Sequence, residues 1–263
     1  MQPEHKIFSL NGGQLSYRTC GNGPVLFLLH GLNGNSKSWI KQFEELADEF
    51  RLIAWDAPGY GMSSLTEANI DIYADLAAGL MEGLGIAIYA VLGHSMGGVV
   101  AGRLSGRHAR NINRLILSCT HPGTGLIADE DLGKSYLSRI ENRRTLSDFE
   151  FGRFGAGRML PETVSADTFE IVADIASEVG SEGLEAAIKV INYANNRTVL
   201  SDLNCPVLII DAELDPVVPP ERTTILEELM PQAGRATVIG AGHAPYLENA
   251  RTYNQIISEF MNS

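Results

Sequence analysis

The feature that most constrains this chain is a Gly-His-Ser-Met-Gly sequence at residues 93–97. The apolar run from Ile88 to Leu92 predicts a strand before it, and the residues from Val99 onward predict a helix after it. A Gly-x-Ser-x-Gly between a strand and a helix is typical of a sharp turn in which the serine hydroxyl projects above the sheet. We therefore expect Ser95 to have a strained backbone conformation at the start of the helix.

The two glycines of this turn are expected because the position of each leaves no room for a side chain. A Cβ atom at Gly93 or Gly97 would meet the neighbouring strand or helix. The helix would begin at Ser95, so that its free N–H groups and the positive end of its dipole face the reacting atoms. The same five residues also occur in ordinary glycine-rich turns. The interpretation therefore depends on whether the rest of the chain supplies a base, a carboxylate and oxyanion donors.

The pattern of apolar residues predicts an α/β fold around this turn. Two short strands, residues 7–10 and 14–19, flank Asn11-Gly12-Gly13 and predict an antiparallel hairpin. Beyond it strands and helices alternate, which predicts a parallel, doubly wound sheet. The other predicted strands are residues 25–29, 52–55, 88–92, 115–118, 206–210 and 236–239. The predicted core helices, besides the one from Val99, are residues 38–50, 70–84, 223–230 and 253–261.

The pattern changes after Thr120, where only helical stretches follow until Arg197. These stretches are residues 132–144, 148–159, 166–179 and 182–194. A helical insertion in an α/β core is typical of a cap or lid. We therefore predict a core formed by residues 1–120 and 198–263, and a helical cap formed by residues 121–197, within one structural domain.

A base and a carboxylate follow two of the later strands. His243 lies in a loop directly after the strand at residues 236–239, and Asp215 follows the strand at residues 206–210. Loops at the carboxyl ends of parallel strands share one edge of the sheet. A serine nucleophile needs a histidine base, and the histidine needs a carboxylate to hold its tautomer. We predict a triad of Ser95, Asp215 and His243, with Asp211 as a structural carboxylate.

The oxyanion of an acyl-transfer intermediate needs backbone N–H donors. One donor is expected from Met96, the residue after the nucleophile, and the other from Leu32, in the loop after the strand at residues 25–29. His30, in the same loop, is interpreted as a buried residue that organises the loop. His94 is expected to point away from the reacting centre.

Substrate-binding residues are expected in and near the cap. Arginines are concentrated in the first half of the cap of an otherwise acidic protein, and an arginine can bind a carboxylate with two hydrogen bonds. We predict Arg143 and Arg144 as such residues, and His121 as a residue that lines the pocket. Asp56 and Ser63 are expected to stabilise their loop. The arginines of this stretch are Arg139, Arg143, Arg144, Arg153 and Arg158.

Composition excludes several classes of partner. The 263 residues carry a formal net charge of −12, whereas nucleic acids and anionic membranes bind basic surfaces. Three cysteines without a metal-type spacing indicate a reducing compartment, and no apolar signal segment is expected at the N-terminus. We expect a cytoplasmic protein with a small-molecule substrate, no metal and no cofactor. Whether the chain forms a homodimer stays open.

These segments together resemble the α/β-hydrolase superfamily, in its capped single-domain branch. The resemblance rests on His30-Gly31-Leu32, residues 56–63, Gly93–Gly98, Asp215 and Gly242-His243. It implies an α/β-hydrolase fold, with a mostly parallel sheet, an antiparallel N-terminal hairpin, helices on both faces and a helical cap insertion. Within the superfamily the chain is most similar to esterases, enol-lactone hydrolases and meta-cleavage carbon–carbon hydrolases. Haloalkane dehalogenases and epoxide hydrolases carry an aspartate at the position of Ser95.

The prediction for function is a serine hydrolase that cleaves a carboxylic ester or lactone of a small organic molecule through an acyl-enzyme on Ser95. The same triad is compatible with cleavage of a carbon–carbon bond, an amide or a thioester. Two other classes fit the same residues: a cofactor-free perhydrolase or dioxygenase, and a receptor for a small ligand.

Overall fold

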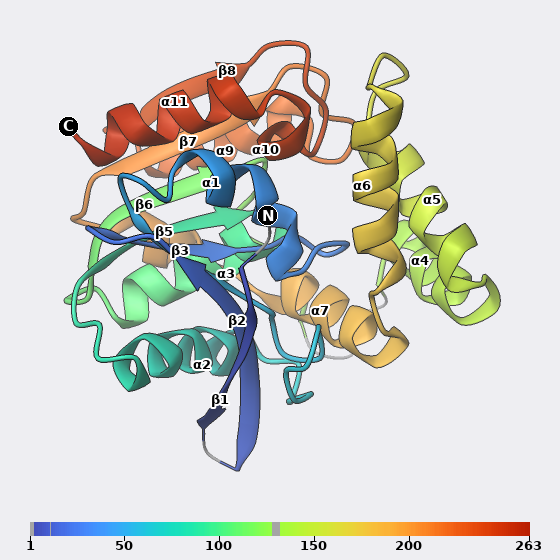
Figure 1. Ribbon diagram of the computed structural model, residues 1–263, viewed down its shortest axis with the longest axis horizontal. Coiled ribbons are helices and arrows are strands. Elements are labelled where there is room, and N and C mark those ends of the chain that lie inside the picture. The colour runs from blue at the N-terminus through green and yellow to red at the C-terminus, as the bar shows by residue number, and fades with distance from the viewer. Residues whose placement is uncertain (1–2, 11, 128–131) are drawn as a thin grey trace.

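The computed structural model describes residues 3–10, 12–127 and 132–263. In this part of the chain the strands form one sheet in the order β1-β2-β4-β3-β5-β6-β7-β8 (Figure 1). The strands are β1 (His5–Leu10), β2 (Gly13–Cys20), β3 (Val25–Leu29), β4 (Arg51–Trp55), β5 (Tyr89–His94), β6 (Ile112–Ser118), β7 (Val207–Ala212) and β8 (Gly234–Val238).

The sheet is antiparallel at its N-terminal edge and parallel elsewhere. β1 pairs with β2, and β2 with β4, in antiparallel register, while every pair from β4 through β8 is parallel. This confirms the predicted hairpin and the parallel core. Of the predicted hairpin turn, Asn11 lies outside the described residues, and Gly12 has a φ of +82°, a conformation that favours glycine.

Two apolar layers cover the two faces of the sheet. In β3, Leu26 and Leu28 pack in one layer, and Phe27 and Leu29 in the other, because successive side chains of a strand point to opposite faces. Figure 1 shows helices on both sides of the sheet. The core helices are η1 (Ser36–Trp39), α1 (Ile40–Glu45), α2 (Ile70–Gly83), α3 (Met96–Arg107), α8 (Arg197–Ser201), α9 (Pro220–Leu229), α10 (Pro245–Glu248) and α11 (Ala250–Met261).

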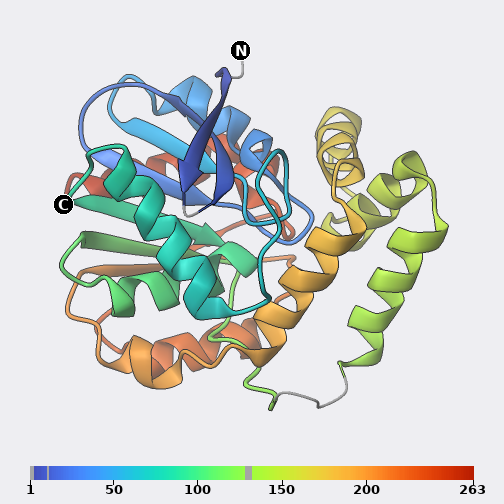
Figure 2. The ribbon, with the colours of Figure 1, turned by 90° about the horizontal axis from the view of Figure 1, so that it is seen from below.

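Among the described residues five helices lie between β6 and β7, and the first four fall within the predicted cap segment. These four are α4 (Lys134–Thr145), α5 (Asp148–Met159), α6 (Ala166–Ser177) and α7 (Ser181–Tyr193). Figures 1 and 2 show α4, α5 and α6 set to one side of the sheet, while α7 runs back toward the core, where it contacts α2 and α3. In the described parts of the chain, no helix has both the length and the apolar character to cross a membrane.

The prediction of one helix over residues 38–50 is wrong. A capping box at Asn35 starts the 3-10 helix η1, α1 ends at Glu45, and turns follow up to Phe50. These turns pack against Gly21, where a Cβ atom would lie 2.1 Å from the Phe50 carbonyl oxygen. Leu46 and Phe50 are still buried in one apolar layer, so the apolar spacing identified the buried residues but not the end of the helix. The short helices α8 and α10 were not predicted.

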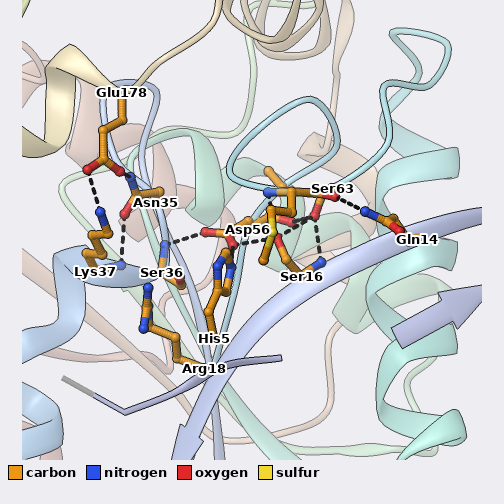
Figure 3. A network of polar contacts seen from close by, with 12 residues as sticks. His5, Gln14, Ser16, Arg18, Asn35, Ser36, Lys37, Asp56, Ser63 and Glu178 are labelled. Carbon is orange, nitrogen blue, oxygen red and sulfur yellow. Dashed lines mark hydrogen bonds and ion pairs between the residues drawn. The ribbon is translucent and has the colours of Figure 1, made fainter. Parts of the chain in front are cut away.

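Asp56 joins the N-terminal hairpin to the loops at the carboxyl edge of the sheet (Figure 3). Its carboxylate accepts hydrogen bonds from the Ser16 hydroxyl at 2.6 Å and the Ser36 N–H at 2.7 Å, and contacts the His5 Nε2 atom at 2.6 Å. Burial opposes ionisation of Asp56, but these partners outweigh it and lower its pKa. The Ser63 hydroxyl donates to the Asp56 carbonyl oxygen at 2.7 Å, which confirms the predicted stabilisation of this loop.

His30 organises the loop that follows β3, as predicted. Its buried ring accepts a hydrogen bond from the Ala57 N–H at Nε2 and donates from Nδ1 to the Gly31 carbonyl oxygen. Burial lowers the pKa of His30, so the ring is neutral and its two nitrogens have distinct roles. At the far end of the same loop, the amide of Asn35 donates to Glu178, just after α6, at 2.9 Å, and Lys37 forms an ion pair with the same carboxylate (Figure 3).

Candidate active site

Ser95 lies at the sharp turn between β5 and α3. Its backbone has φ 53° and ψ −116°, a region that non-glycine residues rarely adopt and that is associated with functional sites. This agrees with the predicted strain. The helix α3 begins at Met96 with Ser95 as its N-cap, so its N-terminus directly follows the serine, as expected.

The glycines around Ser95 leave room for the close approach of backbone segments. A Cβ atom at Gly93 would lie 2.2 Å from the Gly97 carbonyl oxygen, and one at Gly97 would lie 2.1 Å from the Leu29 carbonyl oxygen. Both contacts involve backbone atoms, which cannot rotate away as a side chain can. The turn therefore requires glycine at both positions, for the reason predicted from the sequence.

The structure brings Ser95, His243 and Asp215 together in a chain of hydrogen bonds. The His243 Nε2 atom lies 3.0 Å from the Ser95 hydroxyl oxygen, and its Nδ1 atom lies 2.7 Å from the Asp215 carboxylate. His243 is 3% exposed and Asp215 is 7% exposed, so the bond between these two residues is shielded from water. The arrangement can transfer a proton from the hydroxyl to the imidazole while the carboxylate holds the ring in place.

Asp215 is held ionised by its surroundings. Burial opposes its ionisation, but His243 and the N–H groups of Val217 and Val218 outweigh it and lower its pKa. The two N–H groups donate to one carboxylate oxygen at 2.8 and 2.9 Å. Asp211, the rival carboxylate, instead forms an ion pair with Arg235 at 3.0 Å, which agrees with the structural role expected for it.

The expectation that His94 points away from the reacting centre is wrong. Its ring packs 4.8 Å from the His243 ring and lines the same cavity as Ser95. Its Nε2 atom lies 2.7 Å from the His243 carbonyl oxygen, so it fixes the backbone that carries the candidate base. Burial, followed by the nearby His243, lowers the pKa of His94 to about 3.

Leu32 and Met96 line one cavity together with Ser95. In the described part of the chain, the backbone N–H of neither residue donates a hydrogen bond. Met96 is the first residue of α3, where the N–H has no partner inside the helix. Both residues therefore lie at the same hollow as the serine, with backbone N–H groups that no hydrogen bond among the described residues occupies.

Two hollows meet at Ser95 and share the lining residues Leu32, Arg139 and Val217. The smaller, of about 20 Å³, is also lined by His94, Met159, Tyr246 and His243. We call it the small pocket. The larger, of about 220 Å³, is also lined by His121, Tyr136, Arg158 and Arg222. We call it the arginine chamber.

The structure does not bring Arg143 and Arg144 to Ser95. Arg143 donates to the Val179 carbonyl oxygen and to Asp148, both at 2.5 Å, and Arg144 pairs with Glu185 at 2.6 Å. These arginines hold the inserted helices to one another. His121 does line the arginine chamber, as predicted, and its Nδ1 atom accepts the Gly123 N–H at 3.1 Å. Burial, followed by the charge of Arg222, lowers the pKa of His121 to about 4.

Arg139, Arg158 and Arg222 reach the chamber instead, and none of them was predicted as a site residue. Arg139 and Arg158 belong to the noted group of arginines, but the spacing of the sequence does not show which of that group faces the core. Arg222 follows β7 at the carboxyl edge of the sheet, the same edge as Asp215. That position after a strand could have identified Arg222 as a candidate site residue from the sequence.

One group of side chains in the described residues has the composition of a metal site. His94, Cys119 and His243 are buried, with one potential ligand atom each within 4.8 Å of the others. Both nitrogens of His243 and the Nε2 atom of His94 already have hydrogen-bond partners in the site. We therefore interpret this group as part of the Ser95 site.

Comparison with known proteins places the chain in context. It is 28% identical over 256 residues to a pimeloyl-[acyl-carrier protein] methyl ester esterase of Yersinia pseudotuberculosis, covering 94% of this chain and 97% of that protein. It is 27% identical over 264 residues to the biotin biosynthesis bifunctional protein BioHC of Teredinibacter turnerae, covering 91% of this chain but only 45% of that longer protein.

A solved structure shares the fold of this chain, and a family profile identifies its family. The crystal structure of the enol-lactonase from Burkholderia xenovorans LB400 superposes with a TM-score of 0.86 at 23% identity, covering 98% of this chain and 100% of that one. A profile of the alpha/beta hydrolase family matches residues 26–256. The chain belongs to the alpha/beta hydrolase family.

Proposed function

We propose that this protein is a serine hydrolase that cleaves a carboxylic ester or lactone of a small organic molecule through an acyl-enzyme on Ser95. The observation that carries the proposal is the hydrogen-bond chain from Ser95 through His243 to Asp215, at 3.0 and 2.7 Å. The similarity to a methyl ester esterase over 94% of the chain supports ester cleavage.

The proposed reaction has two halves. The Ser95 oxygen attacks the acyl carbonyl carbon while the His243 Nε2 atom takes its proton, and the oxyanion that forms accepts hydrogen bonds from the Leu32 and Met96 N–H groups. His243 then gives the proton to the leaving alcohol. In the second half His243 takes a proton from water while the water oxygen attacks the acyl carbon. His243 then gives this proton to the Ser95 oxygen as its bond to the acyl carbon breaks, which releases the acid and restores the hydroxyl. Asp215 stabilises the positive charge on His243 in both halves.

Residues 121–197 act as the cap over Ser95, because Arg139, Met159 and Ile191 of the inserted helices line the hollows around the serine. The chemistry assigned to the triad needs no cofactor. We also retain a cytoplasmic location as part of the proposal.

The test compares wild type with Ser95→Ala on p-nitrophenyl esters of about two to about twelve carbons, because the chain length that is hydrolysed fastest reports the size of the pocket at Ser95. We expect wild-type activity, its loss in the variant, and labelling of Ser95 alone by a fluorophosphonate. Ser201→Ala is a matched control, because Ser201 lies on α8 and lines neither hollow at Ser95. Labelling without hydrolysis of any ester or lactone would contradict ester chemistry and favour carbon–carbon or amide cleavage. Oxygen uptake would favour the dioxygenase class.

A further inference from the structure

The arginine chamber carries positive charge in a protein that is otherwise acidic. Arg139 comes from α4, Arg158 from α5 and Arg222 from α9, so three separate elements bring a guanidinium to one hollow of about 220 Å³. Among the described residues, no aspartate or glutamate lines it. The whole chain carries a net charge of −12. Three cations at one place are therefore a local feature and do not follow from the overall charge.

Arg139 has no carboxylate partner among the described residues. Its guanidinium lies over the Tyr136 ring at 5.9 Å, and no ion pair involves it. Burial and the charge of Arg158 lower the pKa of Arg139, which means that its charged form is disfavoured where it stands. A guanidinium stays charged in proteins, so this position costs stability unless an anion joins it.

The other arginines of the inserted helices show the contrast. Arg143, Arg144 and Arg153 each pair with a carboxylate, at 2.5, 2.6 and 2.7 Å. The two arginines of these helices that line the chamber do not pair with a carboxylate in the described part of the chain. Arg158 donates to the Ser135 hydroxyl at 3.2 Å, and the guanidinium of Arg139 contacts the face of the Tyr136 ring. The unpaired arginines are thus the ones that line the chamber.

His121 adds a neutral donor to the same hollow. Its Nδ1 atom accepts the Gly123 N–H, so in the neutral ring the proton is on Nε2. That N–H can donate to an anion, and so can the Tyr136 hydroxyl beside it.

We propose that the arginine chamber binds a carboxylate on the substrate, so that the enzyme prefers esters or lactones whose acid or alcohol part carries a second, free carboxylate. Arg139 lines both hollows at Ser95, which places the bound carboxylate within a short chain of the bond to be cleaved. The volume of the chamber fits a short carbon chain. This inference rests on the proposed hydrolase function.

The experiment uses three ethyl esters that differ only at the far end of three methylene groups: monoethyl glutarate, ethyl pentanoate and ethyl 4-aminobutanoate. They are anionic, neutral and cationic. Ethanol release gives kcat/KM for each. We expect wild type to prefer the anionic over the neutral ester by about 10-fold to 100-fold, as charge-assisted hydrogen bonds provide, and to disfavour the cationic one.

Arg139→Gln, Arg158→Gln and Arg222→Gln keep side-chain bulk and remove one charge each. We expect Arg139→Gln to reduce the anionic-to-neutral ratio by about 10-fold, and Arg139→Lys to restore part of it. Arg144→Gln is the matched control, because Arg144 lies on the same helix but pairs with Glu185; it should leave the ratio unchanged. Melting temperatures verify that each variant is folded.

The outcomes separate the two proposals. The proposed carboxylate site is overturned if wild type hydrolyses the anionic and neutral esters equally, or if all three substitutions leave their ratio unchanged. Either result leaves the proposed hydrolase function standing. If wild type hydrolyses none of the esters, titration with glutarate and pentanoate decides independently of turnover. Tighter binding of glutarate that weakens in Arg139→Gln supports the chamber, and equal or absent binding overturns it.

Discussion

The catalytic triad and the arginine chamber adjoin each other at Ser95, but they are built in different ways. Ser95, Asp215 and His243 each follow a strand of the parallel sheet, so the pairing of the strands fixes their positions. The chamber takes Arg139 and Arg158 from the inserted helices and Arg222 from α9. Its shape therefore depends on how helices pack against one another and on the sheet. The two parts are not independent, because the His243 N–H donates to the carbonyl oxygen of Met159, the last residue of α5, at 2.8 Å.

The largest effect on activity should come from substitutions in the triad, which the strands of the sheet hold in place. Ser95→Ala is expected to lower kcat by about 10⁴-fold to 10⁶-fold while the melting temperature changes little, because the hydroxyl contributes to the reaction and little to packing. Asp215→Asn should also lower kcat by about 10⁴-fold, because the neutral amide favours the wrong tautomer of His243. Steady-state kinetics and thermal melts together check this. A loss of activity that tracks a loss of folding would contradict it.

A Cβ atom should be tolerated at Gly157, in the inserted helix α5, but not at Gly97, in the turn after Ser95. Gly97→Ala places a methyl group 2.1 Å from the Leu29 carbonyl oxygen and should destabilise the fold by about 3 kcal/mol. Gly157→Ala in α5 meets nothing within 4 Å and should stabilise it by about 0.5–1 kcal/mol. Urea unfolding measures both. Similar values for the two variants would show that the turn is not held as tightly as the contacts indicate.

One buried histidine at the small pocket and one at the arginine chamber should make the free energy of unfolding decrease as the pH falls. His94 and His121 have pKa values lowered to about 3 and about 4, so below pH 6.5 the unfolded chain binds protons that the folded chain does not. This reduces stability by about 2 kcal/mol per histidine between pH 7 and pH 5. Urea unfolding at several pH values checks the slope. It should become shallower in His94→Asn, whereas an unchanged slope would show that His94 is not held neutral.

The smallest effect is expected at the contact between the core loop that follows β3 and the end of the inserted helix α6. Glu178→Ala removes the partner of Asn35 and Lys37 and should lower stability by about 1 kcal/mol or less, because one partner is exposed. Glu170→Ala, which removes the exposed pair with Arg153 inside the inserted helices, is the control. If the contact also holds the helices over Ser95, Glu178→Ala alone should raise KM.

The sequence predicted the sheet and the Ser95 constellation because both depend on local patterns. Continuous apolar runs predict buried parallel strands, and the tight turn at Ser95 admits only glycine at residues 93 and 97. The same approach failed at residues 46–50, where apolar spacing marked buried residues although the chain had left the helix.

The binding residues were harder to predict because they depend on packing between helices. Arg139 and Arg144 lie on the same helix with the same side-chain chemistry, yet one lines the chamber and the other pairs with Glu185. That difference follows from how α4 packs against α5 and α7, which involves contacts distant in the sequence. His94 was misplaced for a similar reason, since its position is set by the His243 carbonyl oxygen.

The order of the site along the chain has a consequence for folding. Ser95 and His243 are separated by 148 positions, and the inserted helices lie between them. Contacts of such high sequence separation form late, because a long loop must close before they contribute. During synthesis the serine therefore leaves the ribosome long before its base. In a partly synthesised chain the Ser95 hydroxyl has no base beside it. Under the proposed mechanism, Ser95 becomes a nucleophile only when β8 has joined the sheet and brought His243 to it.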